Sequence, residues 1–151
     1  MNDKNVNILL VEDNKMDIAL TLDAFKVIRL SNLVRVVRNG EETIDYLTGA
    51  GKYTDRDEYP LPGLILLDLK LPKVSGIEVL KFIKTTPVIK RIPTIILTSS
   101  NDESNRIKTY DLGINSYLVK PVTFEGFIKI VNKISDYWIT LNMNAPLRGK
   151  K

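Results

Sequence analysis

The sequence contains neither cysteine nor histidine among its 151 residues. Without cysteine the chain has no disulfide framework and no thiolate chemistry. Without histidine it has no Ser-His-Asp triad, no imidazole ligand for a metal and no phosphohistidine of its own. A metal bound here would therefore need oxygen ligands, and these favour a hard cation such as Mg²⁺.

Long apolar runs are also missing, because none approaches the roughly 20 residues of a membrane span. The polar start from Met1 to Asn7 lacks the apolar core of a signal peptide. We therefore expect a cytoplasmic protein with no membrane partner. The net charge is only +4, with Arg148, Lys150 and Lys151 supplying much of it. Such a mild charge is a weak indication of nucleic-acid binding, which we do not expect.

Two short apolar runs end in acidic residues. Residues 64–67 are followed by Asp68, and residues 8–11 are followed by Glu12 and Asp13. Continuous apolar runs of this length indicate strands buried on both faces, as in a parallel sheet covered by helices. Open α/β sheets bind ligands at the carboxyl ends of their strands, so the three carboxylates are expected to meet in one crevice.

The same alternation of strand and helix continues along the whole chain. It predicts an α/β protein with a five-stranded, doubly wound parallel sheet. The predicted strands are residues 6–11, 34–37, 64–67, 93–97 and 116–119. The predicted helices run from Asn14 to an exit at Asn32, and over residues 41–47, 77–85, 102–112 and 124 to about 141. Residues 49–63 form a long polar loop, residues 1–141 one domain and residues 142–151 a tail.

The polar residues that follow the strands form a chemically coherent set, comprising Glu12, Asp13, Asp68, Thr98 and Lys120. Neighbouring carboxylates repel one another, and a divalent cation relieves that repulsion. With a lysine and a hydroxyl donor added, the set suits phosphoryl transfer onto a carboxylate. Each residue alone has an ordinary structural explanation: Asp13 as a helix cap, Asp68 in a turn, Tyr117 in the core. Only the joint pattern, with every member at the carboxyl end of a predicted strand, indicates a functional site.

Together with Pro72 and Gly76, Tyr117 and Pro121, this set resembles the receiver domain of two-component response regulators. The resemblance covers residues 6 to about 140. It implies a flavodoxin-like sheet of order 2-1-3-4-5, with Asp68 as the phosphoacceptor. It also implies Mg²⁺ held by Glu12, Asp13, Asp68 and the backbone carbonyl of Lys70. Lys120 would pair with the phosphoryl group, its bond to Pro121 would be cis, and Thr98 and Tyr117 would be coupled switch residues.

The sequence departs from the common receiver pattern at two positions of the implied site. Glu12 stands where many receivers have aspartate, and it reaches one methylene further. Lys70 stands two residues after the acceptor, where a smaller or more neutral residue is common. The run from Leu67 to Lys73, the long loop before it and the Tyr137-Trp138 pair resemble the small single-domain regulators that serve bacterial phytochrome kinases.

These features predict a stand-alone receiver that accepts a phosphoryl group from a partner histidine kinase and switches a protein-interaction surface. The expected protein is not an enzyme beyond its own phosphorylation and dephosphorylation. Little chain follows the last helix, so we expect no DNA-binding output domain. One alternative is a phosphorylation-independent interaction module on the same fold. Another is a Mg²⁺-dependent phosphatase with an aspartate nucleophile, although such enzymes usually carry a second aspartate where Lys70 stands.

The last helix carries more apolar surface than one packed face requires. At about 100° per residue its apolar side chains cover roughly half the circumference, whereas packing on a sheet needs a stripe of about 100°. The surplus edge consists of Ile130, Tyr137 and Leu141. With Trp138 it predicts a homodimer through this helix, since aromatic residues are enriched at interfaces. The alternative is that the loop or the tail covers this edge within the monomer.

Overall fold

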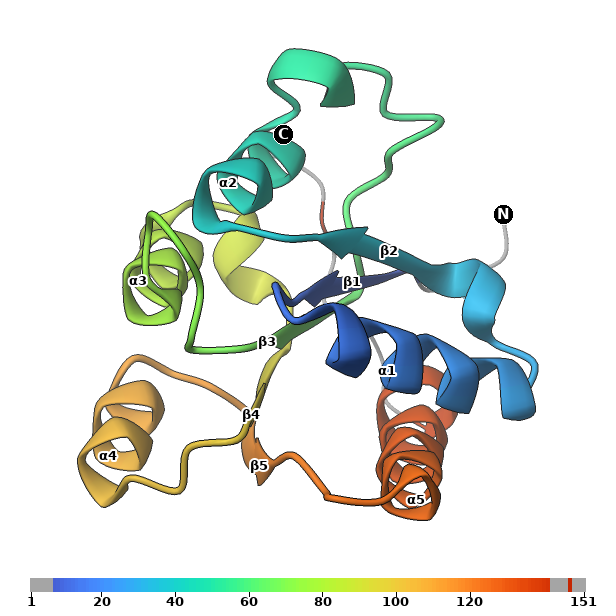
Figure 1. The fold of residues 1–151 in the computed structure, drawn as a ribbon. Helices are drawn as coiled ribbons and strands as arrows, with labels where there is room; N and C mark the ends of the chain where they lie inside the picture. Colours follow the sequence, from blue (N-terminus) through green and yellow to red (C-terminus); the bar gives the residue numbers. More distant parts are fainter. Residues whose placement is uncertain (1–6, 142–146, 148–151) are drawn as a thin grey trace.

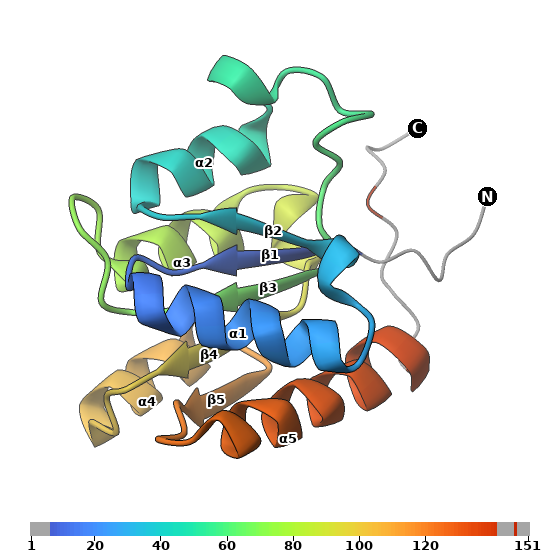
Figure 2. The ribbon, with the colours of Figure 1, turned by 45° about the vertical axis from the view of Figure 1, so that its right-hand side comes forward.

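Five parallel strands form one sheet in the order β2-β1-β3-β4-β5, as the family resemblance implied. The structure is a computed structural model, and it describes residues 7–141 and 147, with only the backbone for 139–141. The strands are β1 (Ile8–Val11), β2 (Val34–Val37), β3 (Leu64–Leu67), β4 (Thr94–Thr98) and β5 (Ser116–Val119). Figure 2 shows all of their arrows pointing the same way, so their carboxyl ends share one edge of the sheet.

Five α-helices cover the two faces of the sheet. They are α1 (Lys15–Val27), α2 (Gly40–Thr48), α3 (Gly76–Thr85), α4 (Glu103–Asp111) and α5 (Phe124–Ile134). Helices α1 and α5 lie side by side on one face, and α2, α3 and α4 lie on the other (Figure 1). Each helix starts where a polar side chain accepts a hydrogen bond from a first-turn backbone N–H. These caps are Asn14, Asn39, Ser75, Asp102 and Thr123.

The apolar runs of the central strands supply two hydrophobic cores at once. Successive side chains of a strand point to opposite faces. Leu9 and Val11 of β1 therefore pack in the core beneath α2 and α3, whereas Ile8 and Leu10 pack in the core beneath α1 and α5. Strand β3 divides in the same way. Burial on both faces explains why these strands are continuously apolar instead of alternating.

Two helices end differently from the sequence prediction. Helix α1 ends at Val27, before the predicted exit at Asn32, because Arg29 adopts a positive φ of 65° and a short 3₁₀ turn (Ser31–Leu33) follows. The last helix is α-helical only to Ile134 and continues as a π-helix over Ser135–Leu141. A π-helix has a wider turn, so the 100° spacing used for the sequence prediction does not hold beyond Ile134.

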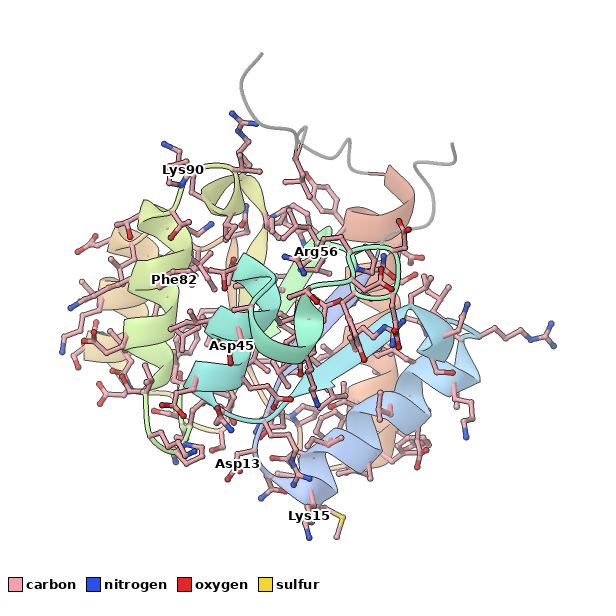
Figure 3. All side chains as sticks on the ribbon, turned by 90° about the horizontal axis from the view of Figure 1, so that it is seen from above. Asp13, Lys15, Asp45, Arg56, Phe82 and Lys90 are labelled. Carbon is pink, nitrogen blue, oxygen red and sulfur yellow. The ribbon has the colours of Figure 1, made fainter. Side chains whose placement is uncertain are left out.

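The predicted loop at 49–63 is packed onto the sheet edge through tyrosines. The rings of Tyr46, Tyr53 and Tyr59 form a cluster with centroid distances of 4.9–6.1 Å. Arg56, labelled in Figure 3, donates to the carbonyls of Tyr59 and Leu47, both at 2.9 Å. These contacts tie the loop to α2 and fix the conformation of a segment that lies outside the sheet.

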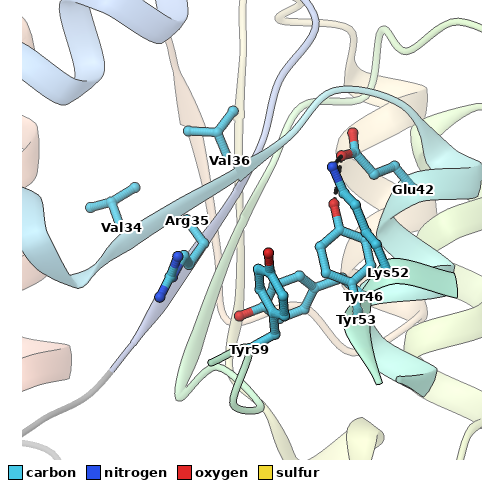
Figure 4. Close-up of a pocket in the computed structure, with 8 residues that line it drawn as sticks. All are labelled: Val34, Arg35, Val36, Glu42, Tyr46, Lys52, Tyr53 and Tyr59. Carbon is cyan, nitrogen blue, oxygen red and sulfur yellow. Dashed lines mark hydrogen bonds and ion pairs between the residues drawn. The ribbon is translucent and has the colours of Figure 1, made fainter. Parts of the chain in front are cut away.

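A surface pocket of about 320 Å³ lies between this loop and β2 (Figure 4). Its polar groups bond mainly to one another. Tyr53 donates to Glu42 at 2.6 Å, Tyr46 donates to the Pro60 carbonyl at 3.0 Å, and Arg35 stacks over the Tyr59 ring. These bonds account for the pocket as part of the loop anchor. Of the tail predicted at 142–151, only Leu147 is described, and it is partly buried against the core beneath α2 and α3. Among the described residues, no helix is long and apolar enough to span a membrane.

Candidate functional site

The strand pattern brings Glu12, Asp68 and Lys120 to one place. Leu10, Leu66 and Leu118 all pack on the face beneath α1 and α5. Glu12, Asp68 and Lys120 each follow two residues later, where the alternation returns the side chain to the same face. Strand β4 lies between β3 and β5. The long side chain of Lys120, which follows β5, is therefore needed to extend past the end of β4 and reach Asp68.

The ammonium group of Lys120 lies at the centre of the site. Its Nζ atom is 2.7 Å from Glu12 Oε1 and 2.8 Å from Asp68 Oδ2. It is also 2.7 Å from Oδ2 of Asp17, in the first turn of α1. The side chain of Lys120 is only 8% exposed, and those of Glu12 and Asp68 are 4% and 5% exposed. Three carboxylates therefore share one buried ammonium, which leaves two formal negative charges in excess.

Asp17 is a site residue that the sequence analysis did not identify. In the sequence it stands within the predicted first helix, and its backbone N–H donates to Asn14 Oδ1 at 2.9 Å. The N–H of Asn14 in turn donates to Glu12 Oε2 at 3.1 Å. One hydrogen-bonded turn thus connects Glu12 and Asp17. The available signal was an acidic residue in the first turn of a helix that follows an acidic strand end.

The Asp68 carboxylate is held by a backbone N–H on one oxygen and by Lys120 on the other. Its Oδ1 atom accepts a hydrogen bond from the Lys70 N–H at 3.1 Å, while its Oδ2 atom faces Lys120. The start of α3 lies directly against this turn. A Cβ atom on Gly76 would come within 2.4 Å of Leu69 Cα and 2.6 Å of the Asp68 carbonyl oxygen. Only glycine fits there, which gives a physical reason for the Gly76 of the sequence pattern.

The two buried carboxyl groups have pKa values that move in opposite directions. Burial raises the pKa of Glu12 to about 7, and the charge of Asp68 adds to this, although Lys120 opposes it. Burial also disfavours the charge on Asp68, but the hydrogen bond and charge of Lys120 prevail and lower the pKa of Asp68. For Lys120, the hydrogen bonds to Asp17, Asp68 and Glu12 outweigh burial and raise the pKa. Asp68 and Lys120 are therefore held ionised.

The four predicted metal ligands are only partly gathered. Glu12 and Asp68 meet, whereas Asp13 is exposed beside the start of α1, near Lys15 (Figure 3). Within the described ranges, no three acidic side chains are arranged as a ready metal cage. The chemistry of the donors nevertheless fits a hard divalent cation. The site has only oxygen donors, an excess of negative charge and a protonation-prone Glu12, and each of these favours an added cation.

Thr98 and Tyr117 lie on the other side of the sheet from Lys120. Thr98 is fully buried at the end of β4, and its hydroxyl oxygen accepts from the Ser100 N–H at a long 3.5 Å. Tyr117 is half-buried, and its hydroxyl donates to the Ser100 carbonyl at 2.8 Å. Both side chains therefore contact the same short loop. Among the described contacts, no side-chain hydrogen bond connects Thr98 to Asp68 or Lys120.

The cis peptide bond that the resemblance implied at Lys120-Pro121 is not found. The described residues contain no cis peptide bond. With the bond in the trans form the Lys120 ammonium still reaches all three carboxylates. The trans form is also the intrinsic preference of such bonds, by about 0.5–1 kcal/mol.

The surplus apolar edge predicted on the last helix is smaller than expected. Ile130 is partly buried and packs within the core beneath α1 and α5, as does Trp138. Tyr137 is 54% exposed and meets the Trp138 ring edge-on at 4.8 Å. The side chain of Leu141 lies outside the described residues. Tyr137 and Trp138 also line a groove of about 460 Å³ between α5 and β5.

Comparison with known proteins finds relatives along nearly the whole chain. Residues 8–132 match the family described as "Response regulator receiver domain". Response regulator Rcp1 of Synechocystis is 39% identical over 132 residues, covering 87% of this chain and 88% of Rcp1. The probable methanogenesis regulatory protein FilR2 of Methanothrix harundinacea is 38% identical over 138 residues, covering 89% of this chain and 84% of FilR2.

Solved structures agree in both fold and sequence. The phosphorylated cyanobacterial phytochrome response regulator RcpA superimposes with a TM-score of 0.86 and 38% identity, covering 93% of this chain and 99% of RcpA. The Mn²⁺-bound form of Rcp1 superimposes with a TM-score of 0.83 and 37% identity, over the same shares of the two chains. Since these matches include the carboxyl edge that carries Asp68 and Lys120, the chain belongs to the response regulator receiver domain family.

Proposed function

We propose that this receiver accepts a phosphoryl group on Asp68 and uses it to switch a surface that other proteins bind. The observation that carries the proposal is the environment of Asp68, a buried carboxylate 2.8 Å from a buried ammonium at the end of β3. Fixed positive charge at the point where negative charge develops is what phosphoryl transfer requires. Glu12, Asp13, Asp68 and the carbonyl of Lys70 would hold Mg²⁺, which supplies further charge neutralisation at the phosphoryl oxygens.

The transfer itself is a displacement at phosphorus. A carboxylate oxygen of Asp68 forms an O–P bond while the P–N bond to a histidine of the partner kinase breaks. The bonding electron pair stays on the imidazole nitrogen, which takes a proton from water. The Lys120 ammonium then moves outward and pairs with the phosphoryl oxygens. The acyl phosphate carries a charge near −2 in place of the single negative charge of the Asp68 carboxylate. This charge attracts the Thr98 hydroxyl and frees space for Tyr117 to leave the Ser100 carbonyl. Such coupling is typically worth about 1–3 kcal/mol.

Incubation with Mg²⁺ and acetyl phosphate tests this proposal directly. Intact mass should show a single phosphoryl adduct on the wild-type protein and none on Asp68→Asn. An adduct forming on Asp68→Asn at the wild-type rate would refute the assignment. The same experiment separates the alternatives. A module independent of phosphorylation takes up nothing, and a phosphatase consumes the phosphodonor in steady-state turnover without accumulating the adduct.

For the phosphodonor we propose a sensor histidine kinase, and a phytochrome-like one in particular. RcpA is a phytochrome response regulator, and it resembles this chain across nearly its full length. FilR2, a probable regulator of methanogenesis, is similarly close in sequence, so a kinase sensing another signal is the alternative. Phosphotransfer profiling against the kinases of the source genome decides between them, because the cognate kinase transfers fastest at short times.

We also propose that the protein pairs with a second copy through the π-helix that follows α5. The support is the exposed Tyr137, its edge-on contact with Trp138 and the adjoining groove along β5. Strand β5 is the outer strand of the sheet on this side, so a second copy would cover an open sheet edge and an aromatic pair together. Sedimentation of the wild type with and without a phosphoryl analogue tests this pairing.

A further inference from the structure

Three carboxylates surround the Lys120 ammonium in the unphosphorylated site. A lysine ammonium has three N–H donors, and three carboxylate oxygens lie within 2.7–2.8 Å of Nζ. Binding a phosphoryl oxygen therefore requires that at least one of these contacts be weakened. The contacts with Glu12 and Asp68 belong to the reaction site itself. The contact with Asp17 does not, because Asp17 reaches in from α1.

The backbone of Asp17 is held in place independently of Lys120. Its N–H bonds to the Asn14 cap, and its carbonyl accepts the Thr21 hydroxyl at 2.7 Å. Its side chain is 24% exposed, more than those of the other two carboxylates. Water can therefore solvate the Asp17 carboxylate when the Lys120 ammonium moves away. The side chains of Glu12 and Asp68 are almost inaccessible to water.

We propose that Asp17 is a positioning residue that restrains Lys120 and weakens its attraction for the phosphoryl group. This inference rests on the proposed function of Asp68. A phosphoryl group on Asp68 lies beyond the carboxylate oxygens, so Lys120 must move outward to follow it. Asp17 holds the ammonium back. Removing the Asp17 charge therefore strengthens phosphoryl binding, while Glu12 still orients Lys120.

Beryllofluoride, a phosphoryl analogue, provides an equilibrium test in excess Mg²⁺. Asp17→Asn keeps the size of the side chain and removes its charge. We expect it to bind beryllofluoride about tenfold more tightly by titration calorimetry, since a hydrogen bond between two charged groups restrains Lys120 more strongly than one to a neutral amide. Asp17→Glu should bind with close to wild-type affinity. Asp23→Asn, which removes an exposed charge from the same helix, is the matched control and should leave the affinity unchanged.

A double-mutant cycle with Lys120→Gln separates restraint of Lys120 from a general electrostatic effect. In the Lys120→Gln background, Asp17→Asn should change the affinity less than twofold. Where calorimetry is too insensitive for Lys120→Gln, the initial rate of phosphorylation by acetyl phosphate, followed by intact mass, gives the same comparison. An unchanged affinity in Asp17→Asn overturns the inference, and so does an equal gain with and without Lys120. A wild type that takes up neither beryllofluoride nor a phosphoryl group contradicts the proposed function instead.

Discussion

Glu12 is a buried carboxyl group whose pKa is raised to about 7, mainly by burial and also by the charge of Asp68. A raised pKa for an acid means that the folded protein binds a proton that the unfolded chain has released. Between pH 4.5 and 7 the folded state therefore holds more protons, and its free energy of unfolding falls as pH rises. The shift corresponds to a loss of up to about 3 kcal/mol across this window.

Urea unfolding at a series of pH values, without divalent ions, tests this prediction. Glu12→Gln mimics the protonated form, so its free energy of unfolding should depend much less on pH between 4.5 and 7. Glu41→Gln is the control, because Glu41 is an exposed acid with a solvated partner in Lys73. It should retain the wild-type slope. Parallel curves for the wild type and Glu12→Gln would show that Glu12 is ionised normally in the folded state.

Lys120 should matter more for the phosphoryl group than for the metal. Lys120→Ala removes the cation that now neutralises Glu12 and Asp68, so Mg²⁺ affinity should be retained or increased. The switch in response to phosphorylation should nevertheless be weakened. Mg²⁺ titration followed by NMR, with Asp13→Ala for comparison, checks these separate roles. Equal losses of Mg²⁺ affinity in both variants would contradict them.

Gly76 is required by close packing. Gly76→Ala places a methyl group against the backbone of Asp68 and Leu69, and overpacking of this kind costs about 1–3 kcal/mol. It should also displace the acceptor and slow phosphorylation by acetyl phosphate. Gly51→Ala is the control, since Gly51 has a positive φ of 61° but a Cβ there would come no closer than 3.8 Å to Asp45 Oδ2. The Gly51→Ala variant should lose some stability but accept a phosphoryl group from acetyl phosphate at the wild-type rate. Equal phosphorylation rates in Gly76→Ala and the wild type would argue against the close approach.

At the scale of elements, the loop at 49–63 depends on a small number of anchors. Arg56→Ala removes two charged hydrogen bonds to backbone carbonyls, with an expected loss of about 1.5–3 kcal/mol in the free energy of unfolding. Amide exchange in residues 50–60 should accelerate, while phosphorylation of Asp68 stays unchanged because the loop lies away from the carboxyl edge. Lys52→Ala, which removes an exposed side chain 3.9 Å from Glu42, should have little effect. Unchanged exchange in Arg56→Ala would refute the anchoring role.

At the scale of the whole molecule, we predict self-association through Tyr137. Tyr137→Glu places a charge in the proposed interface without disturbing the core, because Tyr137 is exposed. Ile130 is unsuitable for this purpose, since it is partly buried and packs against the core of the monomer. Sedimentation equilibrium should show a dimer for the wild type and a monomer for Tyr137→Glu. Val27→Glu, at an exposed position of α1, is the control and should remain dimeric. A wild type that stays monomeric at high micromolar concentration, with or without beryllofluoride, would exclude the proposed dimer.

The sequence by itself determined the sheet, its helices and most of the residues at its carboxyl edge. Continuous apolar runs identified the buried strands, and the caps Asn14 and Thr123 marked helix starts, because these signals depend on residues close in the chain. Asp68 and Lys120 could be placed at the carboxyl edge because each directly follows a predicted strand. The sheet order came from the family resemblance, and the structure agrees with it.

Tertiary structure alone decided which of these groups touch. Asp17 and Lys120 are 103 residues apart in the chain, and no local pattern records that α1 brings a third carboxylate to the lysine. The same holds for the exposure of Asp13, the trans bond at Pro121 and the burial of Ile130. Each depends on how α1, α5 and the strand ends pack together. Secondary structure follows from neighbouring residues, whereas the charge balance around Lys120 depends on elements that only the folded chain brings into contact.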